Sequence, residues 1–135
     1  MKEPNNSTHS DGLQMLTLDW PPTVNTYWRH KGNNVYISKR GHEYRVHVAR
    51  AIARQGIRQV KGYLKLNIIA RPPDNRRRDI DNILKALLDS LEYGGVFEDD
   101  YQVKKISIER SDPYKPNGLL VVYLWPWGCF GSYDR

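Results

Sequence analysis

The fold of this chain is decided by residues 80–92, which read IDNILKALLDSLE. Apolar residues recur there at intervals of three and four, and this spacing places them on one face of a helix. The members of that face are Ile80, Ile83, Leu84, Leu87, Leu88 and Leu91. Gly94 and Gly95 follow and are expected to end the helix. The stretch therefore predicts an amphipathic helix with one side toward a core.

Strands are predicted on both sides of this helix. Before it, residues 63–71 alternate between apolar and polar side chains, and Pro72-Pro73 breaks the strand. After it, residues 103–110 alternate in the same way. Residues 119–125 are nearly all apolar, which predicts a strand that is central or buried on both faces.

The N-terminal half adds further elements. Residues 13–20 alternate and predict a strand, which Pro21-Pro22 stops because proline cannot donate a ladder hydrogen bond. Residues 23–34 are polar and aromatic and are interpreted as a loop. A short strand is predicted at 35–37 and a helix at 38–55, since apolar residues of the latter fall on one face.

This order of elements predicts an α+β fold in a single domain. We expect a mixed β-sheet of about four or five strands packed with two helices. The folded domain is expected to span residues 13–125. A disordered N-terminal lead (1–12) and a C-terminal tail (126–135) would flank it.

The composition favours a polyanionic partner. Lys and Arg number 21 against 15 Asp and Glu, which gives a net charge of +6. No apolar run approaches the roughly 20 residues of a membrane span. Residues 1–12 also lack the apolar core of a signal peptide. We therefore expect no membrane partner and a cytoplasmic location.

Cysteine usage and motif content exclude several kinds of chemistry. Cys129 is the single cysteine, so an intramolecular disulfide and a cysteine-based zinc cage are both excluded. The sequence contains no Walker A loop, dinucleotide glycine fingerprint, Gly-x-Ser-x-Gly or His-Glu-x-x-His. We expect no nucleotide cofactor.

Candidate catalytic residues lie where the strand at 63–71 leads into the helix at 80–92. Asp79 and Asp81 are two residues apart, so in an extended lead-in both carboxylates would point to the same side. They could then converge on one Mg²⁺, which prefers hard oxygen ligands. The preceding Arg76, Arg77 and Arg78 would hold phosphates of a nucleic acid.

Each of these residues also has an ordinary structural interpretation. Aspartate at a helix start is a common cap, and Lys85 stands four residues after Asp81, the spacing of a surface ion pair. The arginines could be a solvated run. A third acidic cluster, Glu98-Asp99-Asp100, follows the Gly-Gly turn, so a return to the same end of the domain is geometrically possible. That cluster favours the metal site over the caps.

An aromatic and basic segment provides candidate DNA contacts. It contains Asn25, Tyr27, Trp28, Arg29, His30 and Lys31. Exposed aromatic rings can stack on unpaired bases while cations neutralise phosphates. The alternative is that Tyr27 and Trp28 pack beneath the loop, and His30 is interpreted as a phosphate or structural contact. At least one of Lys104 and Lys105 is predicted to face DNA.

These motifs resemble the RusA-type Holliday junction resolvases. Residues 20–25 (WPPTVN) resemble the family's opening Trp-Pro-Pro-Ser-x-Asn, and residues 27–30 (YWRH) its aromatic-Arg-His stretch. Residues 76–82 (RRRDIDN) resemble its Arg-Arg-Arg-Asp-Leu-Asp-Asn core. Residues 98–103 (EDDYQV) resemble its Asp-Asp-x-Gln-Val segment, with Tyr101 at a position that is usually small.

The resemblance implies an α+β homodimer that binds branched DNA, namely four-way junctions, and makes paired Mg²⁺-dependent nicks. Its metal-binding aspartates would be Asp79, Asp81 and Asp100, and its catalytic lysine Lys85. Whether Asp99 is a ligand stays open. Two other functions also fit the residues: a non-catalytic DNA-binding regulator, and a Mg²⁺-dependent nuclease acting on RNA or flaps.

Overall fold

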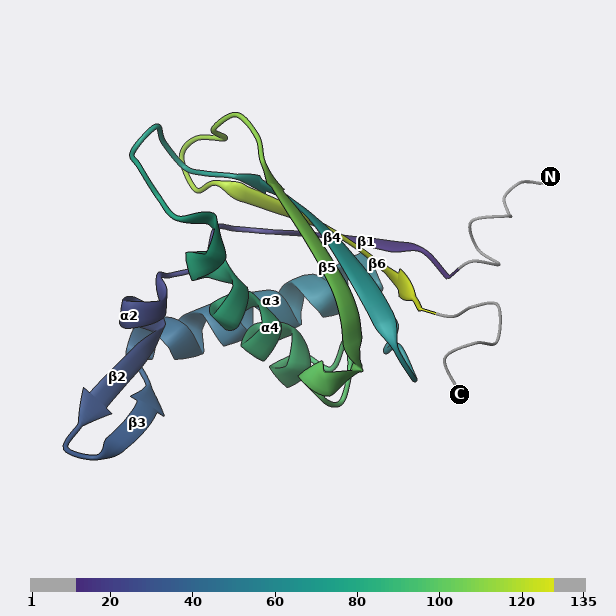
Figure 1. The fold of residues 1–135 in the computed structure, drawn as a ribbon, viewed down its shortest axis with the longest axis horizontal. Helices are drawn as coiled ribbons and strands as arrows, with labels where there is room; N and C mark the ends of the chain where they lie inside the picture. Colours follow the sequence, from purple (N-terminus) through teal and green to yellow (C-terminus); the bar gives the residue numbers. More distant parts are fainter. Residues whose placement is uncertain (1–11, 128–135) are drawn as a thin grey trace.

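The computed structural model describes residues 12–127, which form one α+β domain (Figure 1). It contains a four-stranded mixed sheet and a separate two-stranded sheet. The strands are β1 (Gln14–Leu18), β2 (Trp28–Lys31), β3 (Asn34–Ile37), β4 (Leu64–Arg71), β5 (Val103–Arg110) and β6 (Leu119–Pro126). The helices are α2 (Val24–Tyr27), α3 (Lys39–Gln55) and α4 (Leu84–Tyr93), with the 3-10 turns η2 (Ile80–Ile83) and η3 (Asp100–Gln102). Most of the proposed lead and tail, with Cys129, lies outside the described residues.

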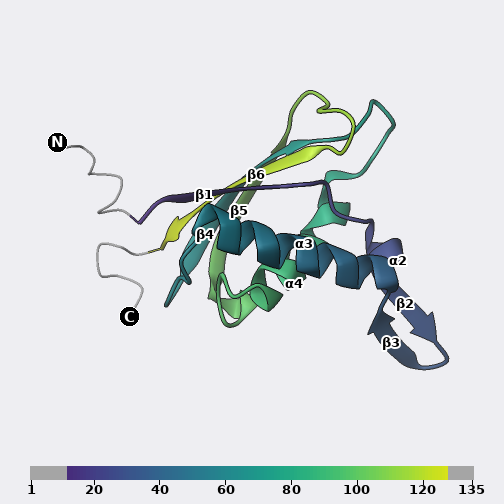
Figure 2. The same ribbon diagram turned by 180° about the vertical axis from the view of Figure 1, so that it is seen from behind.

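The four-stranded sheet has the order β1-β6-β4-β5. β4 pairs with β5 in parallel and with β6 in antiparallel register, so the sheet is mixed as predicted. β6 is central, but only its alternate residues Leu120, Val122 and Leu124 are fully buried. Helices α3 and α4 cover one face of the sheet (Figures 1 and 2). The interior position of β6 in the strand order agrees with the prediction of a strand that is central or buried on both faces.

The two long helices begin and end as their sequences predict, with one exception. Ser38 caps α3, because its Oγ accepts the Gly41 N–H at 3.0 Å, and Gly56 ends it with a φ of 71°. The helix predicted at 80–92 instead starts as a tighter 3-10 turn, η2, before α4. None of the helices that the structure describes is long and apolar enough to span a membrane.

The segment predicted as a loop at 23–34 is wrong in part. Thr23 caps the short helix α2, and β2 follows directly and pairs with β3 through the two-residue turn Gly32-Asn33. The Tyr27 side chain is fully buried and contacts the Trp28 ring edge-to-face at 5.1 Å. Tyr27 therefore packs beneath the surface and cannot stack on a base, which overturns that part of the DNA-contact prediction.

A polar network around Asp89 joins the three helices. The Tyr27 hydroxyl of α2 donates to Asp89 on α4, and it also lies 3.1 Å from the Ser90 hydroxyl. Arg45 of α3 donates to both Asp89 carboxylate oxygens, at 2.9 and 3.2 Å. Burial, and then the hydrogen bond to Asp89, raises the pKa of Tyr27 to about 12. One carboxylate therefore positions α2, and with it the start of β2, against α4.

We expect Asp89→Ala to lower the free energy of unfolding by about 2 kcal/mol, because it removes the ion-pair partner of Arg45 and leaves the Tyr27 hydroxyl only its contact with Ser90. Urea denaturation at neutral pH measures the change. The control is Asp112→Ala, at an exposed position, which should stay within about 0.5 kcal/mol of wild type. Equal effects of the two substitutions would show that the network adds nothing to stability.

Candidate active site

The two predicted metal-binding aspartates lie at the start of η2. Asp79 is the extended residue before the turn (φ −81°, ψ 132°), and its side chain makes no capping hydrogen bond. Asp81 lies inside the first turn of η2, so the argument from a fully extended lead-in is wrong for it. Both residues are exposed. Within residues 12–127, neither carboxylate has an ion-pair partner, so the capping and Asp81–Lys85 alternatives are not observed.

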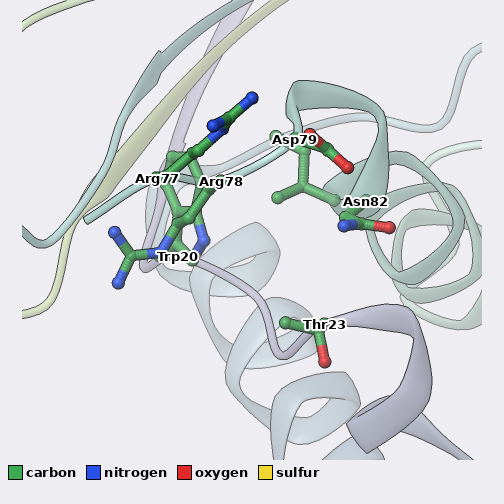
Figure 3. A pocket seen from close by; sticks show the side chains of 7 residues that line it. Trp20, Thr23, Arg77, Arg78, Asp79 and Asn82 are labelled. Atoms are coloured by element: carbon green, nitrogen blue, oxygen red, sulfur yellow. The ribbon is translucent and has the colours of Figure 1, made fainter. Parts of the chain in front are cut away.

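A cleft of about 370 Å³ opens beside Asp79. Its lining residues are Trp20, Thr23, Arg77, Arg78, Asp79, Asn82 and Ile83. Figure 3 shows Asp79 and Asn82 on the η2 side, across from Arg77 and Trp20. A carboxylate and a side-chain amide thus lie across a small opening from a guanidinium, an arrangement suited to a phosphate group with a cation.

The arginine triplet divides into one free residue and two that are held by Asp74. Arg78 Nη1 lies 2.6 Å from Asp74 Oδ1, and Arg76 Nε lies 3.4 Å from Asp74 Oδ2. The hydrogen bond from Arg78 holds the pKa of the Asp74 carboxyl well below its usual range. Arg77 is exposed and has no ion-pair partner within residues 12–127, which leaves it available for a phosphate.

Asp74 was not singled out by the sequence reasoning, although a signal existed. It stands four residues before Arg78, the spacing of an ion pair. Its carboxylate also accepts the Arg76 N–H at 2.9 Å, and Arg110 Nη2 donates to the Arg78 carbonyl at 2.7 Å. The loop before η2 is therefore held in shape by its own charges, and this orients Arg77 and Asp79.

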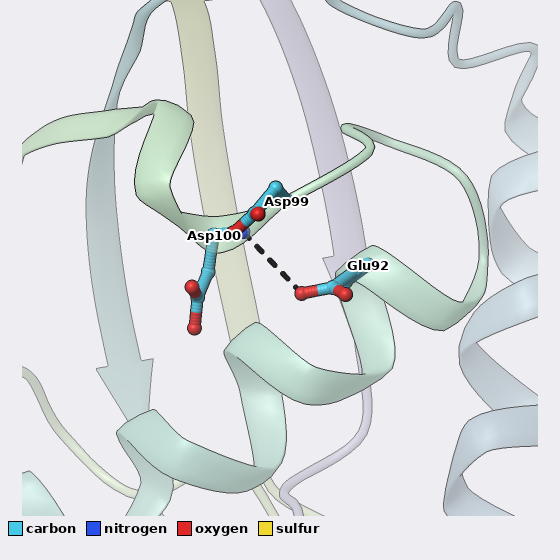
Figure 4. Close-up of side chains that lie close together, drawn as sticks. All are labelled: Glu92, Asp99 and Asp100. Carbon is cyan, nitrogen blue, oxygen red and sulfur yellow. Dashed lines mark hydrogen bonds between the residues drawn. The ribbon is translucent and has the colours of Figure 1, made fainter.

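Asp100 lies at the other end of α4. Its backbone N–H donates to Glu92 Oε1 at 3.3 Å, and Glu92 is in the last turn of the helix. Carboxylate oxygens of Glu92, Asp99 and Asp100 lie within 4.8 Å of one another (Figure 4). A helix of ten residues is about 15 Å long, so Asp100 is separated from η2 by roughly that length. Within one protomer Asp100 therefore lies near the opposite end of α4 from η2, so the return to the same end of the domain that the sequence left possible is not observed.

Two neighbours of Asp100 have roles that the structure makes visible. Asp99 caps η3, because its Oδ1 accepts the Tyr101 N–H at 2.9 Å and its own N–H donates to Gln102. Glu92 was missed by the sequence reasoning. Its position seven residues after Lys85, about two helical turns farther along the same face, could have identified it as a candidate.

The predicted lysines are exposed but not equally free. Lys85 lies in the first turn of α4, and it has no ion-pair partner within the described part of the chain. Lys104 Nζ lies 4.2 Å from the centre of the Tyr63 ring and 5.4 Å from that of Tyr101, a double cation–π contact. Lys105 is exposed on the same strand, β5. Lys105 is thus the freer of the two candidate DNA contacts.

The remaining predicted contacts lie before and on β2. Asn25 is exposed on α2, while Trp28 is partly buried at the start of β2. Arg29, His30 and Lys31 are all exposed along β2. The structure therefore places these three basic side chains on a strand, outside the domain core.

Comparisons with known proteins place this chain in a family. Residues 19–122 match the model of the family described as endodeoxyribonuclease RusA. A crossover junction endodeoxyribonuclease of Enterobacteria phage HK97 is 48% identical over 102 residues, covering 71% of this chain and 81% of the relative. The enzyme of the same name from Escherichia coli K12 is 40% identical over 114 residues, or 84% of this chain and 94% of the relative. One from Enterobacteria phage 82 is 43% identical over 116 residues. This chain therefore belongs to the RusA family of endodeoxyribonucleases.

Proposed function

We propose that this protein resolves four-way DNA junctions by paired, Mg²⁺-dependent nicks, in DNA recombination and repair. The observation that carries the proposal is the pair of exposed carboxylates Asp79 and Asp81, which have no ion-pair partner within residues 12–127. Asp79 lines a cleft that also presents Arg77. The names of the relatives describe the same kind of substrate, a crossover junction. Because those relatives come from bacteria and phages, we place the activity in the bacterial cytoplasm.

The donor chemistry at η2 fits a divalent cation. Asp79 and Asp81 offer hard carboxylate oxygens, exposed to solvent, and neither oxygen pair is neutralised by an ion pair within residues 12–127. Mg²⁺ needs only a few such ligands, because it keeps several of its waters. The chemistry supplied by bound Mg²⁺ is polarisation of the scissile phosphate and a lowered pKa of a water.

The other side chains of the site would bind and orient the DNA. Arg77 faces the cleft and would hold a phosphate next to the scissile one. The ion pairs of Asp74 hold the adjacent Arg76 and Arg78 in place. Lys85 follows Asp81 by about one helical turn, so its ammonium can stabilise negative charge on the leaving oxygen. Lys105 would contact phosphates farther along the strand.

A homodimer would complete the acidic set. In one protomer Asp100 lies a helix length from Asp79 and Asp81, so a single chain cannot bring all three to one ion. A second protomer related by a two-fold axis could supply Asp100 beside the η2 of the first. Two such sites would match the two symmetric strands of a junction, which supports paired nicks.

The test is a panel of labelled substrates: a four-way junction, a flap, a duplex and an RNA hairpin. We expect symmetric nicks in the junction with Mg²⁺, none with EDTA, and far slower cleavage of the duplex. Binding without Mg²⁺-dependent nicking of any substrate would identify a DNA-binding regulator instead. Faster cleavage of the flap or of the RNA would support the same catalytic site but show that its substrate is not the four-way junction.

A further inference from the structure

The hairpin formed by β2 and β3 projects from the N-terminal end of α3, away from the four-stranded sheet (Figures 1 and 2). Every residue from 29 to 36 is exposed. Val35 and Tyr36 are 58% and 50% exposed, so this arm leaves two large apolar side chains in water. A two-stranded hairpin gains little stability alone, and the residues of its tip are exposed. The tip is therefore a candidate binding surface.

The base of this hairpin is firmly attached. Trp28 and Ile37 pack against the core, and the Ser38 N–H donates to the Tyr27 carbonyl at 2.9 Å. At Gly41 the helix comes so close that a Cβ would lie 2.7 Å from both Ile37 Cγ2 and the Tyr27 carbonyl oxygen. Because the arm is already positioned, a ligand that binds its tip meets little ordering cost.

The strand register sorts the side chains of the arm onto two faces. Arg29 pairs with Tyr36, and Lys31 with Asn34, across the hairpin. Opposite residues share a face and alternate residues return to it, so Tyr36 shares one face with Arg29 and Lys31. Val35 lies on the other face. One face thus presents an aromatic ring directly opposite Arg29 and diagonal to Lys31.

The charged residues in the segment that forms the arm are all positive. No Asp or Glu occurs between Asp19 and Glu43, whereas Arg29, Lys31, Lys39 and Arg40 all lie in that interval. Within residues 12–127 the side chains of Arg29, Lys31 and Tyr36 make no hydrogen bond or ion pair. An uncompensated cationic surface with an exposed ring suits a nucleic acid better than a protein surface of mixed charge.

We propose that this face of the hairpin binds DNA at the branch point, with Tyr36 stacking on an exposed base face. Inside a duplex each base face is covered by the next base pair, while at a branch point whose arms are unstacked the covering neighbour is lost. Arg29 and Lys31 would hold the flanking phosphates. This proposal rests on the proposed function, and it adds a residue that selects branched DNA over duplex.

The experiment compares affinities for a four-way junction and a matched duplex, with Ca²⁺ in place of Mg²⁺. Tyr36→Ala should weaken junction binding about tenfold and leave duplex binding nearly unchanged, since stacking on an exposed base is lost. Tyr36→Phe should bind as wild type, because the ring is kept. Val35→Ala removes an equally exposed side chain from the opposite face and is the matched control, expected to change neither affinity.

The fluorescence of 2-aminopurine placed next to the branch point reports the stacking directly. Wild type and Tyr36→Phe should change it on binding, and Tyr36→Ala should not. Equal losses for junction and duplex, or equal effects of Tyr36→Ala and Val35→Ala, would overturn the proposal. A shift in oligomeric state on sedimentation, with the junction-to-duplex ratio kept, would assign the tip to a second copy and also overturn it. If the wild type prefers junctions through Tyr36 but never nicks them, the proposed function fails and this inference stands.

Discussion

Asp81→Asn should lower the rate of Mg²⁺-dependent junction nicking on the order of 10³-fold and leave junction binding intact or stronger. The substitution keeps the size and shape of the side chain and removes one negative charge from the η2 acids. Asp81 is exposed and has no ion-pair partner within residues 12–127, so the fold should not depend on it. The loss would therefore lie in catalysis, and removing a charge that repels phosphate would favour binding.

Rates are measured on a labelled junction under single-turnover conditions, and affinities in Ca²⁺. Asp112→Asn, the same change at an exposed position in the loop before β6, is the control and should cut at the wild-type rate. A wild-type rate for Asp81→Asn would show that the η2 acids do not bind the catalytic ion. Circular dichroism of both variants should match wild type.

The second large effect is a recovery of activity between two inactive chains. Asp81→Asn and Asp100→Asn should each be inactive as homodimers. In the proposed dimer, a heterodimer purified with two different tags should regain one working site, because the intact Asp81 of one chain would lie beside the intact Asp100 of the other. On a cruciform plasmid it should give nicked circles, whereas the wild-type homodimer gives linear product from paired cuts.

The control heterodimer carries the same two substitutions on one chain and none on its partner. If each site draws its acids from both protomers, both sites of this control are damaged and it should be inactive. If each site lies within one chain, the results reverse: the control cuts and the heterodimer with one substitution per chain does not. That reversal would contradict the shared site.

Much of the sheet and of the two long helices could be predicted because burial on one face imposes a period. Apolar residues alternate in β4 and β5 and recur at helical spacing in α3 and α4. The approximate bounds of these four elements follow from those two periods. The short strand predicted at 35–37 is present as β3. Its partner β2 was missed, although Gly32-Asn33 is a typical two-residue turn, with a Gly φ of 61°. The aromatic and polar composition around it resembled a loop.

The candidate site could be predicted residue by residue more easily than in its geometry. Asp79 and Asp81 could be proposed as candidate acids because they are neighbours in the sequence, although η2 places Asp81 inside a turn and not in an extended segment. The position of Asp100 depends on how far α4 carries the chain before it turns back. That distance is a tertiary property, and the sequence separation of Asp81 and Asp100 does not encode it.

The carboxylate of Asp89 connects the hairpin and the catalytic helix proposed above through shared hydrogen bonds. Through Tyr27 and Arg45 it joins the root of the projecting arm and the shaft of α3 to the helix that bears Lys85. If the hairpin binds DNA as proposed, α4 and Lys85 would therefore move with it as one rigid body. The position of the cut relative to the branch point would then be set by the fixed geometry of the domain, without a conformational change.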